Sequence, residues 1–338
     1  MKANTVSAAY LRGLLIRAEQ AGMDPLQLLA SRDIPPSLVQ EPNARIASEH
    51  YVSIAHDIMS RVRDEFLLLG GVRRTPAGAF AMMTHSVIHC RTLKRALLMA
   101  TRFYNLFLDD LQFRVSRQAD QVQIAVRWRD PATDWDHGTT DGCLVLIHRF
   151  FSWLCGQRIS LTEVRLSLPV PENSDEYHTL FRCPLQFNQP IDALVFPAKL
   201  LDLPVMQTET SLKAFLREAP GNLIVIPDND NSVTAQVRSL IGKDFSQEFP
   251  DFESVARAFN TTPQTLRRRL KQENSSYQEI KDTMRRDAAI YYLSRSRYTI
   301  NEIAELMGFS EPSTFHRAFK KWTGLTPGNY RLHTAQDR

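Results

Sequence analysis

The stretch that decides the fold occurs twice in the C-terminal third of the chain. Residues 255–272 read VARAFNTTPQTLRRRLKQ, and residues 303–321 read IAELMGFSEPSTFHRAFKK. In both copies an alanine is followed four residues later by a residue type that tolerates positive φ, Asn260 or Gly308. A small side chain lets two helices cross closely, and a left-handed residue lets the backbone reverse. Each copy therefore predicts a helix-turn-helix.

The second helix of each copy has its own start signals. Thr262 and Ser310 offer N-cap hydroxyls, and Pro263 fits the first helical position, where its missing N–H has no intrahelical partner. Apolar residues at i and i+4 then predict one buried face: Leu266 and Leu270, Phe315 and Phe319. The opposite face is basic. Because a DNA major groove admits one α-helix, this pattern favours a pair of DNA-reading helices over two hairpins with solvated charged faces.

The position along each second helix predicts which part of the DNA a side chain contacts. Residues at the exposed starts are expected to contact base edges: Gln264, Arg267, Arg268, Ser313, His316 and Arg317. Other cations of the two helices are expected to contact phosphates: Arg269, Lys271, Lys320 and Lys321. Arg268 and Arg317 occupy equivalent positions of the repeat, and a structural ion pair is the alternative role for either.

Net charge separates the C-terminal third of the chain, which holds both motifs, from the rest. From residue 232 onward the chain has 17 Lys and Arg and 12 Asp and Glu, a net of +5, whereas the remainder has 24 basic and 25 acidic residues. A moderate positive excess predicts salt-sensitive binding to a polyanion.

The two motifs span about residues 252–273 and 300–323. Between them, residues 275–298 have helical periodicity without Gly or Pro, which predicts one connecting helix.

Residues 232–332 resemble the DNA-binding domain of the AraC/XylS family of transcription regulators. The most specific segment is GFSEPSTFHRAFKKWTG, followed by Leu325, Thr326, Pro327, Tyr330 and Arg331. The first copy departs from the family pattern with Asn260 where glycine is common and Leu270 where an aromatic is frequent. The resemblance implies that one chain reads two successive major grooves, about one duplex turn or roughly 34 Å apart.

The N-terminal two thirds reads as an α+β sensor domain that precedes the all-α domain with two helix-turn-helix motifs joined by a long helix. Helices are expected at residues 5–20, 25–30, 48–63, 76–89, 92–107, 141–155 and 209–217, and strands at 111–117, 121–128, 163–168, 185–187 and 193–196. Three segments carry a resemblance to a known domain: GGVRRTPAGAF at residues 70–80, LKRALLMATRFYNLF at 93–107, and the stretch from VRLSLPV to LLDLPV at 164–205. Through them the region resembles the arabinose-binding-like sensor domain of some AraC-type regulators. We therefore expect an effector-binding or dimerisation domain (1–220), a linker (221–231) and a DNA-binding domain (232–338).

Other site types receive little support. His85 and His89 have the spacing of zinc ligands, but no third ligand is indicated, so neither a metal nor a cofactor is expected. No nucleophile elbow, phosphate-binding glycine loop or Ser, His and Asp arrangement marks an enzyme. The most apolar run, residues 144–155, is too short to cross a membrane. The cysteines lack CxxC pairing and suit a reducing cytoplasm. The aromatic candidates for an effector pocket are Phe103, Tyr104, Phe107 and Trp128, which a core stripe would explain equally well.

These features predict a cytoplasmic, effector-responsive transcription activator that binds double-stranded promoter DNA. RNA polymerase, a small-molecule effector and a second copy of the chain are its candidate partners. Two alternatives stay open. The N-terminal domain is a protein-interaction module without a small ligand, or, with less support, an enzyme that carries a DNA-targeting tail.

Overall fold

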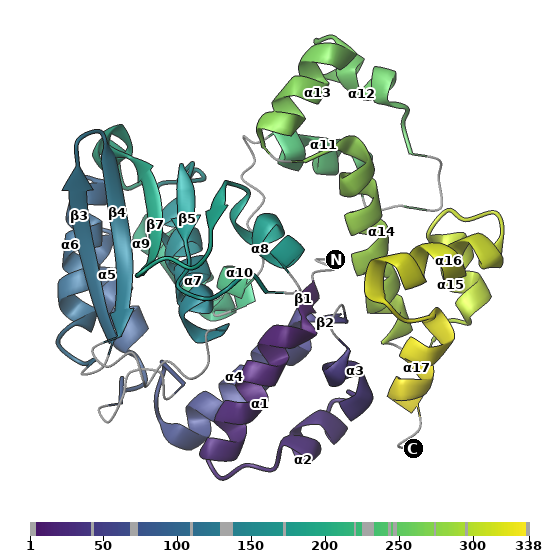
Figure 1. Ribbon diagram of the computed structural model, residues 1–338, viewed down its shortest axis with the longest axis horizontal. Helices are drawn as coiled ribbons and strands as arrows, with labels where there is room; N and C mark the ends of the chain where they lie inside the picture. The colour runs from purple at the N-terminus through teal and green to yellow at the C-terminus, as the bar shows by residue number, and fades with distance from the viewer. Residues whose placement is uncertain are drawn as a thin grey trace. The chain divides into compact units, whose positions relative to one another are not determined.

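The computed structural model describes most of the chain (Figure 1), namely residues 5–41, 44–67, 74–108, 111–128, 138–171, 174–219, 221–224, 233–242, 245, 249–273, 275–294 and 297–335. These residues fold into two compact units. The first unit combines segments that are distant in sequence, Met1–Arg12, Asp24–Tyr51 and Asp230–Arg338, and the second comprises Gly13–Met23 and Val52–Asn229. Helices α1 (Ala8–Gln20) and α4 (Ser48–Val62) contribute residues to both.

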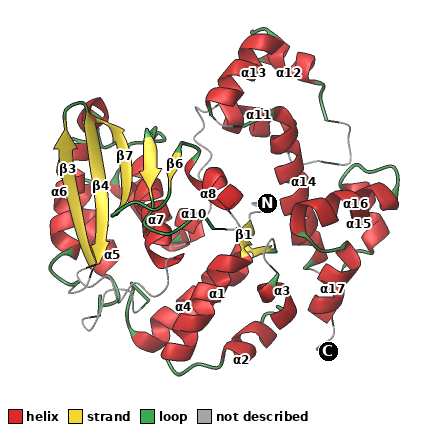
Figure 2. Ribbon diagram, in the orientation of Figure 1, coloured by secondary structure: helices red, strands yellow, loops and turns green. Residues whose placement is uncertain are grey.

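The second unit is built on a five-stranded sheet with the order β3-β4-β7-β5-β6 (Figure 2). Its strands are β3 (Leu111–Gln118), β4 (Gln121–Trp128), β5 (Glu163–Arg165), β6 (Leu185–Gln186) and β7 (Asp192–Pro197). All neighbours are antiparallel except β5 and β6. The two predicted strands β3 and β4 pair antiparallel as a hairpin, in which Leu111 pairs with Trp128. Alternate residues of β4, among them Val122, Ile124 and Val126, are buried and point into one core.

Helices complete that core. They are α5 (Ala79–Val87), α6 (Leu93–Tyr104), α7 (Gly138–Leu154), α8 (Ser174–Phe181), the 3-10 helix η2 (Ala198–Asp202), α9 (Glu209–Glu218) and α10 (Gly221–Ile224). Helix α6 contacts β3, and α7 contacts β7. The apolar stripe of α6, with Leu93 and Leu97 fully buried, lies opposite exposed Lys94 and Arg95, as its periodicity predicts.

The first unit holds both helix-turn-helix motifs. Its C-terminal helices are α11 (Val233–Ile241), α12 (Phe252–Ala258), α13 (Pro263–Gln272), α14 (Tyr277–Leu293), α15 (Ile300–Leu306), α16 (Pro312–Thr323) and α17 (Pro327–Ala335). Helix α14 is the predicted connecting helix: it contacts α11 near one motif and α15, α16 and α17 near the other. Figure 1 shows it running between the two motifs.

Elements from the start of the chain fold into this same unit. They are β1 (Thr5–Ser7), β2 (Arg45–Ala47), α2 (Pro25–Ala30) and α3 (Pro36–Gln40). Strands β1 and β2 pair antiparallel, β2 packs on α14, and α3 packs on α17. The Thr5 hydroxyl donates to Asp287 Oδ1 at 2.7 Å, and the buried Tyr330 hydroxyl donates to the Arg45 carbonyl oxygen at 2.8 Å.

The structure corrects several sequence-based boundaries. Residues 5–7 form a strand rather than the first turn of a helix, because β2 supplies a hydrogen-bonding partner forty residues along the chain. Strand β5 ends at Arg165, three residues earlier than predicted. Helices α3, α8, α11 and α17 were not predicted. Of the expected linker, residues 221–224 form α10, and residues 225–231 lie outside the described part of the chain.

Candidate nucleic-acid interface

The first motif has the predicted turn. Ala256 is fully buried, and Asn260 adopts a left-handed conformation with a φ of 49°. The Thr262 hydroxyl accepts a hydrogen bond from the backbone N–H of Thr265 at 3.2 Å, and Pro263 occupies the first helical position. The N-cap and the left-handed turn together fix where α12 ends and α13 begins.

The second motif keeps the turn but starts its second helix differently. Ala304 is fully buried, and Gly308 has a φ of 73°. The N-cap residue of α16 is Glu311, whose side chain makes no capping hydrogen bond. The prediction that Ser310 caps this helix is therefore wrong. Pro312 takes the first helical position, so that the cap falls one residue later than Ser310.

Each second helix buries the predicted apolar stripe. Leu266 and Phe315 are fully buried, Leu270 is 1% exposed, and Phe319 is fully buried. Helix α13 packs against α12, and α16 packs against α15 and α17. Both helices therefore have one face anchored in a hydrophobic core while the opposite face is left for solvent or a ligand.

The residues expected to contact bases lie on these outer faces. Gln264, Arg267 and Arg268 are exposed on α13, and Ser313 and Arg317 are exposed on α16, whereas His316 is half-buried. Within the described part of the chain, neither Arg268 nor Arg317 forms an ion pair, which was the alternative role for both.

Several of these side chains already have an internal contact. The Ser313 hydroxyl donates to Glu311 Oε2 at 3.3 Å. The Arg267 guanidinium lies 5.3 Å from the centroid of the Phe252 ring. The Arg317 Nη2 atom lies 3.5 Å from the Thr314 hydroxyl oxygen, at the limit for a hydrogen bond. A cation–π contact orients a guanidinium but leaves its N–H edge available to an acceptor. Both arginines therefore remain exposed donors.

The expected phosphate ligands are also exposed. None of them has a carboxylate partner among the residues that the structure describes: Arg269, Lys271, Lys320 and Lys321. Unpaired surface cations attract a polyanion without first breaking an internal salt bridge.

A junction that the sequence did not reveal joins the two motifs. The Arg285 guanidinium of α14 lies 4.3 Å from the Phe249 ring centroid, on the side of the first motif, and 5.1 Å from that of Phe309, in the turn of the second. Burial lowers the pKa of Arg285. A Cβ built on Gly308 would lie less than 3.0 Å from the Phe245 carbonyl oxygen. Backbone and side-chain contacts thus hold the two motifs together.

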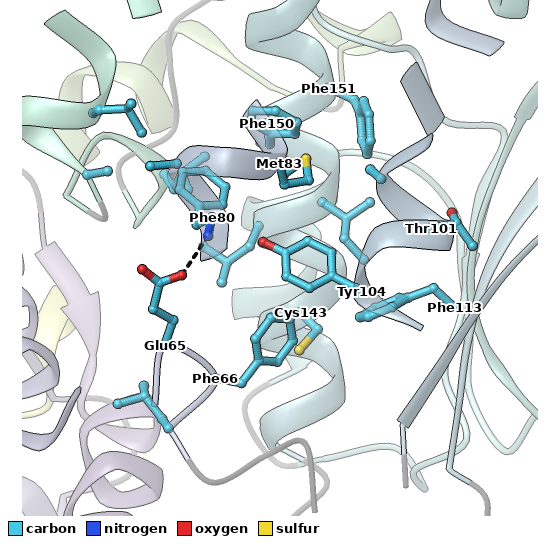
Figure 3. A pocket seen from close by; sticks show the side chains of 18 of the residues that line it. Glu65, Phe66, Phe80, Met83, Thr101, Tyr104, Phe113, Cys143, Phe150 and Phe151 are labelled. Carbon is cyan, nitrogen blue, oxygen red and sulfur yellow. Dashed lines mark hydrogen bonds between the residues drawn. The ribbon is translucent and has the colours of Figure 1, made fainter. Parts of the chain in front are cut away.

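The second unit contains a cavity of about 430 Å³ (Figure 3). Of the four aromatic residues that the sequence offered for an effector pocket, Tyr104 lines it. Phe103, Phe107 and Trp128 are not among its lining residues. Phe103 packs on Phe107 at a centroid distance of 5.0 Å, and Trp128 Nε1 donates to the Thr140 hydroxyl at 2.9 Å, so these three belong to packing within the unit.

The histidine pair has a structural partner. His85 Nδ1 lies 3.3 Å from one carboxylate oxygen of Glu209, and His89 Nε2 lies 3.2 Å from the other. Within the described residues, no group of three or more His, Cys, Asp or Glu side chains is arranged to hold a metal ion. All four cysteines are free. No helix in the described ranges is both long and apolar enough to span a bilayer.

Models of known protein families match both the N-terminal and the C-terminal part of the chain. Residues 22–205 match the family model described as the arabinose-binding domain of AraC transcription regulator, N-term, and residues 255–333 match the model of a helix-turn-helix domain. The ornithine utilization regulator of Pseudomonas aeruginosa is 24% identical over 331 residues, which cover 97% of each chain. The DNA-binding dual transcriptional regulator Rns of Escherichia coli is 36% identical over 95 residues, 28% of this chain and 36% of Rns.

Among solved structures, the transcriptional regulator CdpR from Pseudomonas aeruginosa covers 84% of this chain and 96% of its own, with a TM-score of 0.32 and 22% identity. The matched families and relatives are transcription regulators, not enzymes. The arabinose-binding-type model alone spans more than half of the chain. The chain belongs to the AraC family of transcription regulators, with an α+β N-terminal domain followed by a helical DNA-binding domain.

Proposed function

We propose that this regulator is an effector-responsive activator that reads two successive major grooves of promoter DNA, one with α13 and one with α16. The observation that carries the proposal is the pair of second helices, each with a buried apolar stripe and an outer face of cations that have no carboxylate partner within the described ranges. Base contacts are assigned to Gln264, Arg267, Arg268, Ser313, His316 and Arg317, and phosphate contacts to Arg269, Lys271, Lys320 and Lys321.

The connecting helix supports the two-groove geometry. Helix α14 has 17 residues and spans about 25 Å at a rise of roughly 1.5 Å per residue. That length is of the same order as one duplex turn of about 34 Å, and the motifs packed at its ends extend the span further. The Arg285 contacts with Phe249 and Phe309 oppose changes in spacing between the motifs. We therefore expect half-sites about ten base pairs apart on one face of the DNA.

The assignment of base and phosphate contacts is tested with the full-length protein. Arg317→Ala should weaken binding to a cognate site by about 1–3 kcal/mol and flatten the preference at one or two base pairs. Lys321→Ala, the matched control on the same helix, should weaken binding to all sequences alike and lower the salt dependence. Gel-shift titrations against a library of single-base variants measure both effects. A uniform loss for Arg317→Ala would make it a phosphate contact instead.

The proposal that the protein is an activator rests on two relatives, and the proposal that it binds an effector rests on the cavity of the second unit. Two proteins of Escherichia coli that match over about a quarter of this chain are described as activators, the activator CfaD and the urease operon transcriptional activator. The cavity in the second unit offers space for a small molecule. We assign effector binding or dimerisation to residues 1–220 and DNA binding to residues 232–338, and RNA polymerase and a second copy of the chain are the proposed protein partners.

In vitro transcription from a footprinted promoter tests the sign of regulation. An activator should raise the transcript yield when purified RNA polymerase is present, and a repressor should lower it. Size-exclusion chromatography with light scattering tests the homodimer. A second unit that binds no small molecule in thermal-shift screens would favour a protein-interaction module over an effector domain, because a ligand that binds only the native state must raise the melting temperature.

A further inference from the structure

The cavity of the second unit has predominantly apolar walls. Helices on several sides, strands β3 and β4 and the turn at Phe66 supply its aromatic and aliphatic lining. Figure 3 shows Phe66, Phe80, Phe113, Phe150 and Phe151 around it. Its volume of about 430 Å³ lies within the range of roughly 300–1,000 Å³ that small-molecule pockets occupy. Water in such a space finds few polar partners, so displacing it with an apolar molecule is favourable.

The Tyr104 hydroxyl lies in the cavity wall and has no hydrogen-bonding partner among the residues that the structure describes. The Tyr104 ring is held edge-on by Phe66 at a centroid distance of 5.0 Å and by Phe103 at 5.4 Å. Figure 3 shows its hydroxyl pointing toward Phe80 and Met83. Across the described residues, this hydroxyl makes no hydrogen bond. Burial, and then the nearby charge of Glu65, raise the pKa of Tyr104, which keeps the phenol protonated. It is a neutral donor and acceptor in a nearly apolar wall.

The charged group on the opposite wall is already engaged. The Glu65 carboxylate accepts hydrogen bonds from the backbone N–H groups of Gly78 at 2.5 Å and Phe80 at 2.6 Å, at the N-terminus of α5. Its role is to cap that helix, and it presents a negative charge to the cavity. His56, which also lines the cavity, is exposed. Arg149 is buried close by and donates to the Leu223 carbonyl oxygen, but it is not a lining residue.

We propose that the cavity binds an uncharged, mainly apolar small molecule whose single polar group hydrogen-bonds the Tyr104 hydroxyl, and that anionic amphiphiles are excluded by the carboxylate of Glu65. This inference deepens the proposed effector function and rests on it. An anion in a cavity with few donors would lose its hydration without a compensating partner, and it would meet a like charge. A neutral molecule loses little on entering and gains the contacts of the aromatic walls.

A matched pair of fluorescent probes tests the charge preference. N-phenyl-1-naphthylamine is neutral and has one N–H, and 8-anilinonaphthalene-1-sulfonate is the same molecule with an added sulfonate. Titrated into the full-length protein, the neutral probe should gain fluorescence with saturation, and the sulfonate should bind about tenfold more weakly or worse. Equal binding of the two probes, or no binding of the neutral one, would overturn the proposal.

Variants locate the binding and separate its parts. Ala81→Leu, which fills the cavity from α5, should abolish binding of the neutral probe, while the control Ser86→Leu, at an exposed position of the same helix, should not. Tyr104→Phe should weaken the neutral probe about two- to twelvefold, the value of one hydrogen bond. Glu65→Gln should bring the affinities of the two probes together. Probe binding that survives Ala81→Leu would place the site elsewhere and refute the assignment.

The same samples distinguish the two levels of the proposal. Gel shifts with promoter DNA report the proposed regulator function directly, whereas the probe titration does not involve DNA. If DNA binding is normal and the probe fails, the inference about the cavity is wrong and the regulator function stands. If the probe binds as expected and DNA binding is absent, the proposed function fails while the cavity assignment stands.

Discussion

Replacing Gly308 with alanine adds one methyl group to the turn between α15 and α16. Gly308 has a φ of 73°, and the left-handed conformation costs an alanine about 1–2 kcal/mol. The new Cβ would also lie less than 3.0 Å from the Phe245 carbonyl oxygen, a backbone atom that cannot rotate away. Relieving such an overlap in packed structure costs about 1–3 kcal/mol. The two effects together should lower the stability of the second motif by about 2–5 kcal/mol.

The equivalent position of the first motif provides the control. Asn260 has a φ of 49° and already carries a Cβ, so Asn260→Ala changes only the left-handed preference and should cost about 1 kcal/mol. Hydrogen exchange of the full-length protein, read by mass spectrometry in peptides that cover α15–α16 and α12–α13, measures each motif separately. A loss of protection for Gly308→Ala no larger than that for Asn260→Ala would refute the steric argument.

Four further substitutions test other parts of the structure. Burial, and then the charge of Arg158, lower the pKa of His148 from 6.5 to about 3. Its contribution to the free energy of unfolding is therefore present above pH 6.5 and falls by about 2 kcal/mol between pH 6.5 and 5, because the unfolded chain binds the proton first. Urea unfolding of His148→Gln should lose that part of the pH dependence. Thr262→Ala should destabilise α13 by about 1 kcal/mol in exchange measurements, whereas Ser310→Ala should leave α16 unchanged because Ser310 is not its cap. Arg285→Met removes a cation held between two phenylalanine rings and should weaken binding to paired half-sites more than to a single half-site in gel shifts; equal weakening of both would show that Arg285 does not set the spacing.

Local features of the DNA-binding half could be predicted from the sequence. The left-handed turns at Asn260 and Gly308, the cap at Thr262 and the buried stripes depend on residues within a few positions of one another, and spacing alone specifies them. The prediction that Ser310 caps α16 was wrong because Pro312 takes the first helical position and makes Glu311 the N-cap residue. Sequence patterns rarely fix a helix boundary to within one residue.

Features that depend on distant segments could not be predicted. Strand β1 has three residues, and its partner β2 lies forty residues away, so no local alternation marks it. The rings on either side of Arg285 come from separate parts of the chain, and no spacing rule connects them. Tyr104 could be proposed for a pocket because it lies in an aromatic run, but the rings that complete the cavity come from other helices, from β3 and from the turn at Phe66. Tertiary packing decides such neighbours.

The first unit can be completed only after the C-terminal end of the chain has been synthesised. The hydrogen bond between Tyr330 and Arg45 joins residues 285 positions apart, so Arg45 of β2 leaves the ribosome long before Tyr330 is synthesised. At about 5–20 residues per second, that wait lasts roughly 15–60 seconds. The three-residue strands offer little edge for mispairing with other nascent chains in the interval. The unit that holds both helix-turn-helix motifs is thus completed last, and a chain released early cannot assemble it.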